Sequence, residues 1–508
     1  MIVTVRTAAD LGLDAIAAVA FAGAQVELAP EALQRVGAAR AEAMDALARG
    51  GRVYGVNTGL GYQFFRDVEP GDGPIHERSL LLGRAVGSAP FLPAGEVRAL
   101  LAVRLAGFLT GRAGVTPELC ELLASCLNTG FTPAIPTESI GCAGEIIPLA
   151  HAFSALAGEG LVVTPGGSTS HAAEALVKRA MRPFQPAAKE GIALLGGAPG
   201  AVALGIARLR DVRSVARSTL VSAAAATDAA SAPVGPYDPA LGRLSRDALL
   251  EDVLVRFDRL VGRGDREDGT GGAGVQAPVS FRVAPQVQTY LERTAGRFEE
   301  DLRLALEAVT DSPALVEGRF VSNGGFHQIG VTAGMETLAA ALARAGELSV
   351  QRAHRLLDGR VTGLADQLTP GPGPGCGLVV VHKRAVGSLG ELRRLAAPAS
   401  VGVADTSLGQ EDAMTFSFEG ASRLRRAVTL VRDILACELL TALQAWWLRR
   451  RAGGRGPAPG LAGVEELLAR TVAPVTEDRP LGGDIDRIVA ILERDGLGGF
   501  PTGGMVRD

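Results

Sequence analysis

The sequence predicts a mainly α-helical protein on three observations. Apolar residues recur every three or four positions in PAGEVRALLAVRLAGFLTG, at Val97, Leu101 and Leu105, and the same spacing returns in RFEEDLRLALEAV. Residues 328–358 and 410–447 are long, rich in Ala and Leu and free of proline, which is typical of helices that cross a whole domain. Alternating strand-like runs are rare, and GRVYGV and GLVVVHK are the two candidates.

The composition indicates a globular protein with an interior of small aliphatic side chains. Hydrophobic residues make up 47% of the 508 residues, charged residues 21% and aromatic residues only 4%. The length suggests about three domains. We expect an N-terminal domain over residues 1–200, a central bundle of long helices over 201–450 and a short C-terminal segment over 451–508.

Charge and cysteine usage indicate the cellular setting. The net charge is −4 with acids and bases interspersed, so no basic face is available for nucleic acid. Asp10 and Asp14 interrupt the apolar N-terminal run, which argues against a signal peptide, and we expect no membrane span or membrane partner. The five cysteines form no CxxC pair, which indicates reduced thiols and no metal site. We expect a cytoplasmic protein.

Four places carry residues with candidate chemistry. Tyr54 lies in VYGVNTGLG, whose three glycines let the backbone approach a ligand, and a phenol can act as an acid or a base. Arg282, in VQAPVSFRVAPQ, could clamp a carboxylate. Glu411 follows an S-x-x-Q stretch at residues 407–410, a capping-box pattern that predicts Glu411 in the first turn of a helix. The fourth place is TESIGCAGEIIPLAHAF, where glycines bracket a cysteine and an alanine.

Each of these residues also has a purely structural interpretation. A tyrosine near a turn is more often a packed ring with a satisfied hydroxyl group. An arginine in a helical protein more often forms an ion pair, and a first-turn glutamate commonly complements the helix dipole. Taken singly, none of the four establishes a site.

A family resemblance connects the four places. Eight motifs occur in the order and approximate spacing of one family: VYGVNTGLG, RSLLLGRAVG, SIGCAGEIIPLAHAF, KEGIALLGG, VQAPVSFRVAPQV, TDSP, SNGGFH and APASVGVADTSLGQED. Over nearly its whole length the chain resembles the histidine and aromatic amino acid ammonia-lyases. The resemblance implies a mainly α, fumarase/aspartase-like fold with a central bundle of long helices. It also implies a homotetramer whose active sites draw on more than one subunit.

The resemblance breaks at the electrophile of the family. In the family an Ala-Ser-Gly triad cyclises and loses two waters to form methylidene-imidazolone (MIO), whose methylene derives from the serine. Here the aligned triad is Cys142-Ala143-Gly144. Ala143 has no leaving group on its β-carbon, and loss of the Cys142 sulfur would place the unsaturation on the wrong ring carbon. We therefore expect no MIO and no other cofactor or metal.

Other functional positions have changed as well. Gly196 stands where the family has an asparagine, and Val279 stands where it usually has a tyrosine. Histidine-specific members tend to have Ser-His where this chain has Gly83-Arg84. A single engineered substitution does not change several positions together. The cation of Arg84 favours an anionic group over a hydrocarbon ring, and the alternative is an internal ion pair with a neighbouring acid.

The residues that are retained predict a carboxylate clamp with an acid and a base. By resemblance, Tyr54 is the expected general base, and Glu411 is the acid or the residue that positions an amine. The expected substrate-binding residues are Arg282, Arg84, Gln276, Phe326 and Asn57.

The triad loop could still act without its electrophile. In the family the triad lies close to helix N-termini, whose N–H groups stabilise anions, so the vacated space could serve as an oxyanion or carboxylate pocket. A thiol in such a place can have a lowered pKa and act as a nucleophile, which would make Cys142 reactive. The alternative is a small residue packed in a tight loop.

These observations predict an MIO-independent enzyme that performs elimination, addition, isomerisation or cyclisation on a small carboxylate-bearing, amino-acid-derived substrate. Without the electrophile, the departing proton must already be acidified by a neighbouring carboxylate, thioester or ketone. One alternative is an ammonia-lyase or aminomutase whose triad serine was mutated to alanine. Another is a catalytically silent homologue that binds a ligand or an active paralogue. A specialised biosynthetic pathway is a natural setting.

Overall fold

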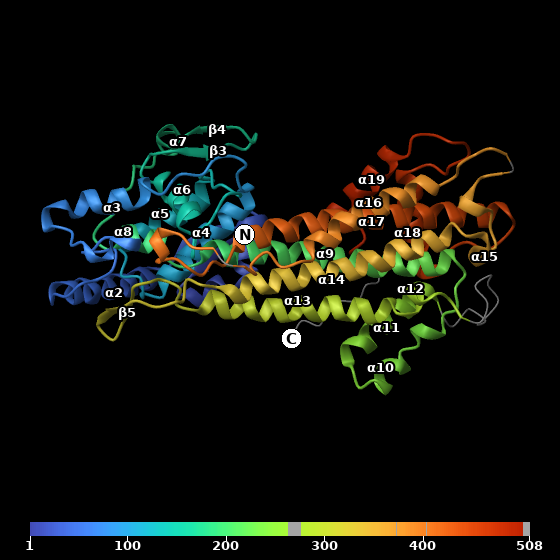
Figure 1. Ribbon diagram of the computed structural model, residues 1–508, viewed down its shortest axis with the longest axis horizontal. Helices are drawn as coiled ribbons and strands as arrows, with labels where there is room; N and C mark the ends of the chain where they lie inside the picture. The colour runs from blue at the N-terminus through green and yellow to red at the C-terminus, as the bar shows by residue number, and fades with distance from the viewer. Residues whose placement is uncertain (263–275, 372, 403, 501–508) are drawn as a thin grey trace. The chain divides into compact units, whose positions relative to one another are not determined.

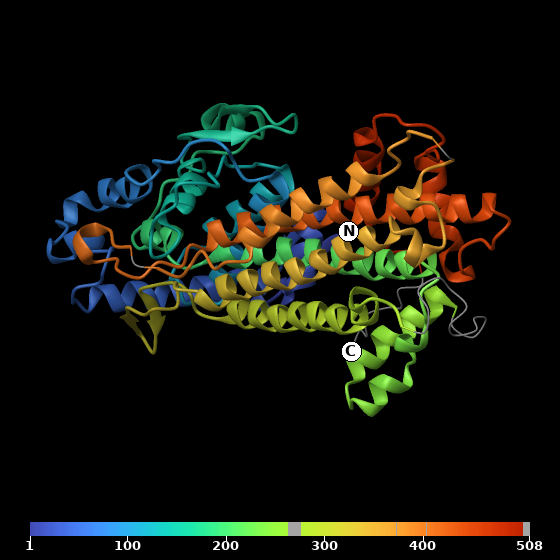
Figure 2. The same ribbon diagram turned by 45° about the vertical axis from the view of Figure 1, so that its right-hand side comes forward.

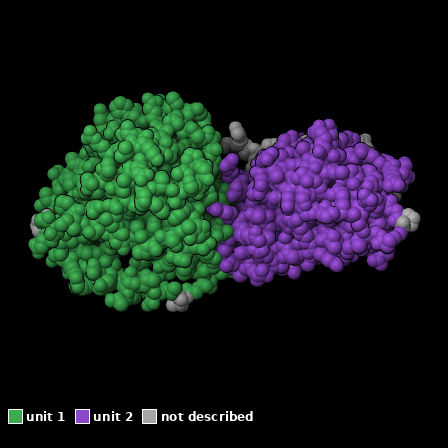
Figure 3. Space-filling model, turned by 90° about the horizontal axis from the view of Figure 1, so that it is seen from above, with its two compact units in different colours: residues 1–208, 298–335, 398–422 green, residues 209–297, 336–397, 423–508 purple. Residues whose placement is uncertain are grey.

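The computed structural model describes residues 1–262, 276–371, 373–402 and 404–500. The chain forms two compact units, which are coloured separately in Figure 3. Unit 1 comprises residues 1–208, 298–335 and 398–422, and unit 2 comprises residues 209–297, 336–397 and 423–508. Each unit is thus discontinuous in sequence, unlike the three continuous domains that the sequence predicts. Most of the points at which the chain passes from one unit to the other lie inside long helices, where no linker-like composition marks a boundary.

Unit 1 contains the strands of the described chain and most of the shorter helices (Figure 1). Its elements are β1 (Ile2–Val5), η1 (Ala8–Leu11), α1 (Leu13–Phe21), β2 (Gln25–Leu28), α2 (Pro30–Ala48), η2 (Gly61–Phe65), η3 (Pro70–Asp72), α3 (Gly73–Leu82), α4 (Ala94–Leu109), α5 (Pro117–Thr129), α6 (Ile146–Ser154), β3 (Leu161–Val163), β4 (Thr169–His171), α7 (Ala172–Lys178), α8 (Glu190–Leu195), β5 (Ala314–Val316), β6 (Arg319–Val321) and η7 (Ser407–Gly409). The strands form three two-stranded sheets: β1 pairs with β2 in parallel, and β3–β4 and β5–β6 are antiparallel.

Helix α4 forms the core of unit 1 and confirms the helix predicted from its apolar spacing. It packs against α1, α2 and α5, and Val97, Leu101 and Leu105 are fully buried. The alanines of its other faces are buried too, because small side chains let the neighbouring helices approach closely. From this helix the buried Arg104 reaches the carbonyl oxygens of Ala193 and Gly196, so the core directly supports the region around α8.

Unit 2 is built around long helices. Four of them contribute residues to both units: α9 (Pro199–Ala229), α13 (Ala284–Glu307), α14 (Ile329–Leu356) and α17 (Ser417–Arg451). Within unit 2 these helices run alongside one another in both ribbon views (Figures 1 and 2). The remaining elements are η4 (Gly235–Tyr237), α10 (Ala240–Leu244), α11 (Ala248–Val261), α12 (Val279–Arg282), α15 (Gly359–Thr362), η6 (Asp366–Leu368), α16 (Val379–Leu395), η8 (Pro459–Leu461), α18 (Ala462–Thr471) and α19 (Gly482–Glu493).

A buried carboxylate ties three of the long helices together in unit 2. Glu438 of α17 accepts hydrogen bonds of 2.6 Å from Ser222 of α9 and 2.6 Å from Ser349 of α14. Arg352 of α14 donates to both carboxylate oxygens, at 2.6 and 3.2 Å. The charge is therefore fully partnered in an interior that water does not reach.

Three local predictions were wrong. GLVVVHK belongs to α16, and GRVYGV forms no strand but ends in a turn around Tyr54. Helix α17 begins at Ser417 because Phe416 has a φ of 49°, a left-handed conformation that interrupts a helix. Glu411 consequently lies outside any helix and is paired with Thr406 in an isolated β-bridge.

The stretch from Glu190 to Ala229 is long and apolar enough, by composition, to cross a membrane, and among the described residues it is the one stretch that meets this test. Of its most apolar window, 94% is buried inside the protein. Such burial is typical of the core helix of a soluble protein.

Candidate functional site

A cavity of about 390 Å³ lies in unit 1 and is called the main pocket below. It brings together four residues that the sequence places far apart: Tyr54, Ala143, Phe326 and Glu411. The triad loop lies close to Phe326, since a β-carbon at position 144 would be in van der Waals contact with its ring at 3.5 Å. The pocket therefore collects the predicted acid and base beside the triad loop.

Glu411 is clamped directly onto the triad. Its Oε2 accepts a 2.9 Å hydrogen bond from the backbone N–H of Ala143, and its Oε1 accepts one of 3.0 Å from the hydroxyl of Ser407. The S-x-x-Q stretch thus positions Glu411 through a side-chain contact and not as a capping box at the start of a long helix. The carboxylate is held at the centre of the site.

Tyr54 is half-buried at the wall of the same pocket. Its hydroxyl oxygen accepts a 2.8 Å hydrogen bond from the N–H of Gly61. Burial raises the pKa of the phenol above its ordinary value of 10.0, and the charge of Glu411 acts in the same direction. The phenol is therefore neutral at physiological pH, which favours Tyr54 as a proton donor and disfavours the phenolate that the predicted general base requires.

Cys142 has the properties of a packed structural residue. It is 8% exposed, and its thiol donates to the carbonyl oxygen of Gly144 at 3.1 Å. Burial raises the pKa of the thiol to about 11 and outweighs the hydrogen bonds from the N–H groups of Ile147 and Ile146. The thiol lies at the start of α6 but is desolvated, which favours the packed small residue over the reactive nucleophile, the two interpretations that the sequence left open.

The helix N-termini around the loop are already satisfied by groups of the chain itself. Glu145, next to the triad, is buried and accepts hydrogen bonds from the N–H groups of Gly200 at 2.6 Å and Ala201 at 2.5 Å, in the first turn of α9. The N–H of Ala143 is bonded to Glu411. A ligand anion would have to displace these carboxylates, so the structure does not supply the open oxyanion pocket that the family geometry implied.

Glu145 also lines the main pocket, and sequence reasoning missed it. Burial raises the pKa of its carboxyl to about 7, although the two backbone N–H groups and Arg104 act in the opposite direction. Its position directly after the triad was the available signal, but the sequence did not show that it would be buried.

This raised pKa predicts a pH-dependent stability. The folded state holds the Glu145 proton more tightly than an unfolded chain does, because the pKa of a glutamate in an unfolded chain is 4.5. The stability that this proton contributes is therefore complete below about pH 4.5 and is lost as the pH rises through about 7, with a total of about 3 kcal/mol. Urea unfolding is measured at about pH 5 and at about pH 8. Between these two values the unfolding free energy of the wild-type protein should fall by more than that of Glu145→Gln, whose amide cannot ionise.

The exposed carboxylate of Glu138, in the same segment, provides the control for this experiment. Glu138→Gln should follow the wild-type pH dependence. If Glu145→Gln also follows it, the buried carboxyl does not titrate in this range.

Behind Gly196, a buried ion pair supports the pocket wall. Lys189 and Asp311 are in contact at 2.8 Å, and the lysine side chain is fully buried. A β-carbon at position 196 would lie 3.2 Å from Asp311 Oδ1, so the glycine permits this close approach. Neither Lys189 in KEGIALLGG nor Asp311 in TDSP was predicted, because a pairing across 122 residues leaves no local sequence signal.

A second cavity of about 420 Å³, called the side pocket below, contains Arg84. The half-buried Arg84 donates one hydrogen bond, of 3.1 Å, to the carbonyl oxygen of Leu80, and within the described chain it forms no ion pair. This excludes the internal ion pair with a neighbouring acid as the role of Arg84. Burial lowers the pKa of its guanidinium, an effect that the electrostatic interactions with Tyr54 and Glu411 oppose.

Three predicted positions lie in unit 2 and line neither pocket: Gln276, Val279 and Arg282. Gln276 and Val279 are exposed, and Arg282 donates through Nε to the carbonyl oxygen of Ala277 at 2.9 Å. Asn57 also lines neither pocket, since its amide bonds to Val53 and Gly51 within its own loop.

No group of three or more His, Cys, Asp or Glu side chains is arranged to hold a metal ion within the described ranges.

Comparisons with known proteins agree with the fold and the motifs. The family model described as aromatic amino acid lyase matches residues 11–470. The chain is 32% identical over 497 residues to histidine ammonia-lyase from Symbiobacterium thermophilum, covering 97% of each. It is similar to the solved tyrosine aminomutase from Streptomyces globisporus, with a TM-score of 0.90, 26% identity and 98% of each chain covered. Ergothionase from Treponema denticola shares the fold, with a TM-score of 0.92 and 24% identity over 98% of this chain and 100% of that one.

Proposed function

Because the chain belongs to the aromatic amino acid lyase family, we propose that it is an MIO-independent enzyme of that family. It uses acid/base chemistry on a small carboxylate-bearing, amino-acid-derived substrate. The observation that carries the proposal is Ala143, which stands at the position of the serine and whose N–H is bonded to Glu411 in the main pocket.

The residues present do not fit the MIO group. Ala143 has only hydrogens on its β-carbon, and Gly196 offers no side chain where the family has the supporting asparagine. The space at Gly196 is also restricted, since a β-carbon there would lie 3.1 Å from the carbonyl oxygen of Ile192. No step of the proposed mechanism therefore passes through MIO, and the substrate itself must acidify the departing proton through a neighbouring carboxylate, thioester or ketone.

Tyr54 and Glu411 form the acid/base pair of this mechanism. The neutral phenol of Tyr54 donates a proton or a hydrogen bond to charge that develops on the substrate. The Glu411 carboxylate is the alternative proton acceptor, and it is reachable from both pockets because it lines both of them. Phe326 adds an apolar ring to the wall of the same pocket, beside Gly144 of the triad loop.

The carboxylate clamp comes from another subunit in this proposal. Arg282 and Gln276 match family site positions but belong to unit 2, whereas both pockets belong to unit 1. A homotetramer of the kind that the family resemblance implies would bring Arg282 of one chain to the main pocket of another. Its guanidinium would then bind the substrate carboxylate through two parallel hydrogen bonds.

The test is to restore the serine. We expect the intact mass of the wild-type protein to equal that of the unmodified chain. Ala143→Ser should show little activity on histidine, phenylalanine or tyrosine even if its mass falls by two waters, because Gly196 and Val279 remain. Mass spectrometry and the absorbance of the unsaturated product measure both effects, with Ala143→Gly as the control that cannot form the methylidene group.

Two outcomes would contradict the proposal. A wild-type mass below that of the unmodified chain would mean that the ring closes without the serine. Strong lyase activity of Ala143→Ser on one of the three amino acids would identify an ordinary ammonia-lyase or aminomutase whose serine had been replaced.

A further inference from the structure

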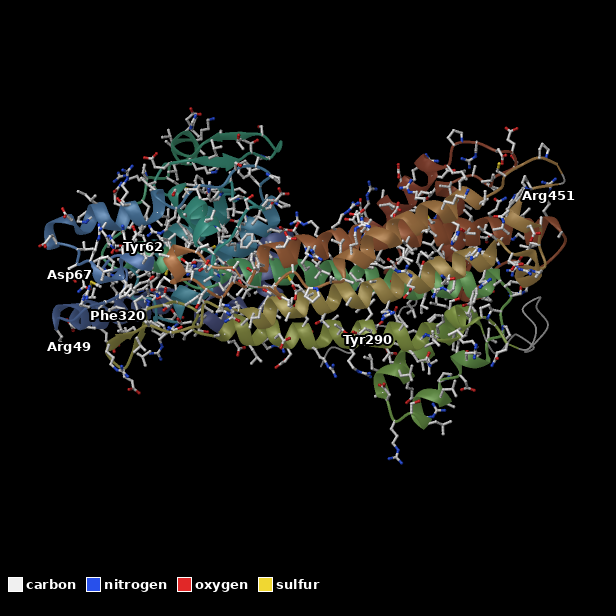
Figure 4. All side chains as sticks on the ribbon, viewed as in Figure 1. Arg49, Tyr62, Asp67, Tyr290, Phe320 and Arg451 are labelled. Carbon is white, nitrogen blue, oxygen red and sulfur yellow. The ribbon has the colours of Figure 1, made fainter. Side chains whose placement is uncertain are left out.

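The main pocket and the side pocket share Glu411. Leu60 and Ile146 also line both cavities, so these three residues form the boundary between them. Tyr62 of η2 lies on the side-pocket wall, close to the orange turn that contains η7 (Figure 4). A ligand that extends past Glu411 would therefore enter a second space of similar volume.

The charged side chains of the two pockets are segregated. In the described lining of the main pocket the acidic residues are Glu145 and Glu411, and the aromatic rings of Tyr54, Phe64 and Phe326 accompany them. In the lining of the side pocket Arg84 is the basic residue, and the shared Glu411 is the acidic one. The matching ligand has a cationic end in the main pocket and an anionic end in the side pocket.

Arg84 is arranged to receive an anion. Its Nη1 donates to the carbonyl oxygen of Leu80 in the last turn of α3, which fixes one end of the guanidinium. No acidic side chain in the described ranges lies within ion-pair distance of it. Partial burial weakens its hydration, so a carboxylate that replaces the lost water would form charge-assisted hydrogen bonds in a medium of low dielectric.

We propose that the side pocket is an anion subsite centred on Arg84, and that the substrate is an amino acid whose side chain ends in a carboxylate. This inference rests on the proposed function for its orientation: the amino group lies in the main pocket near Glu411, and the side chain extends past Glu411 to Arg84. The enzyme thereby selects a charged side chain over the hydrocarbon or imidazole ring of common aromatic amino acids.

Isothermal titration with three phenylalanine derivatives tests this subsite. They carry a 4-carboxy, a 4-carbamoyl or a 4-aminomethyl group, so that they differ mainly in terminal charge. The wild-type protein should bind 4-carboxyphenylalanine about 10- to 100-fold more tightly than the carbamoyl derivative, as expected for a hydrogen-bonded charge pair.

Variants at Arg84, which follows the C-terminal end of α3, and at Arg78 within α3 identify the source of the preference. Arg84→Gln should bind the carboxy and carbamoyl derivatives equally, Arg84→Lys should keep part of the preference, and Arg84→Glu should prefer the aminomethyl derivative. Arg78→Gln is the matched control, because Arg78 lies in α3, close to Arg84 in sequence, and forms an exposed ion pair with Glu159. It should bind all three compounds as the wild type does, and circular dichroism checks that each variant is folded.

The proposal is overturned if the wild-type protein shows no measurable binding of 4-carboxyphenylalanine, or binds it no more tightly than the carbamoyl derivative. It is also overturned if the preference survives in Arg84→Gln. This experiment measures binding alone, so it is independent of the Ala143→Ser experiment. An MIO ring in the wild-type protein would contradict the proposed function but would not change the order of the three affinities. Loss of that order would contradict the anion subsite but not the proposed acid/base mechanism.

Discussion

Replacement of Tyr54 by phenylalanine is expected to lower kcat/KM by about 10²- to 10⁴-fold, the usual contribution of a positioned acid or base. The assay uses elimination from 4-nitrophenylalanine, since a para-nitro group acidifies the benzylic β-proton and so replaces the activation that MIO would give. The product is followed by its absorbance. Tyr290→Phe, which changes an exposed tyrosine of unit 2, should leave the rate unchanged.

The pH dependence of the same reaction distinguishes the two roles of Tyr54. Burial raises the pKa of the phenol above 10.0, so a mechanism that needs the neutral phenol should hold its rate up to about pH 10 and lose it above. A mechanism that needs the phenolate should instead gain rate with pH throughout this range. If Tyr54→Phe retains more than about a tenth of the wild-type kcat/KM, the phenol is neither acid nor base.

Much of the site could be predicted from the sequence because it lies in ordered motifs. Tyr54, Phe326 and Glu411 come from VYGVNTGLG, SNGGFH and APASVGVADTSLGQED, and the structure places all three at one pocket with Ala143. The long helices α14 and α17 were also predictable, since residues at helical spacing fill them over many turns. Patterns repeated over a long stretch leave a strong signal.

Short elements were not predictable in the same way. The run VVVHK has the β-branched residues of a strand, but Val381, Ala385 and Leu389 are buried at a spacing of four, and this packing makes it a helix. The paired strands of unit 1 are only three or four residues long. A segment of that length adopts the structure that its neighbours impose.

Buried charges were the other feature that the sequence did not disclose. Glu145 resembles any first-turn glutamate until α9 is seen to place two N–H groups against it. The raised pKa of Cys142 was not predictable for a related reason: the dipole of a helix can be inferred from the sequence, but the desolvation that outweighs it cannot. Electrostatic predictions at this site therefore required the tertiary structure.

The largest stability effect is expected at Lys189. Lys189→Met would leave Asp311 buried without its cation, and Asp311 Oδ1 already lacks a hydrogen-bond partner in the described structure. Breaking a buried pair from one side costs about 3–5 kcal/mol of unfolding free energy. Urea unfolding measures this loss, and it should be accompanied by disorder of the main pocket, whose wall at Gly196 contacts Asp311.

A double-mutant cycle separates this effect from a simple loss of packing. Lys189→Met combined with Asp311→Asn removes both charges and should recover most of the lost stability, because the unpaired carboxylate is then gone. The exposed pair Arg78–Glu159 is the reference, and Arg78→Gln there should cost less than about 1 kcal/mol. If the double variant is no more stable than Lys189→Met, the cost arises from the packing of the lysine chain, and the wall behind Gly196 does not depend on this charge pair.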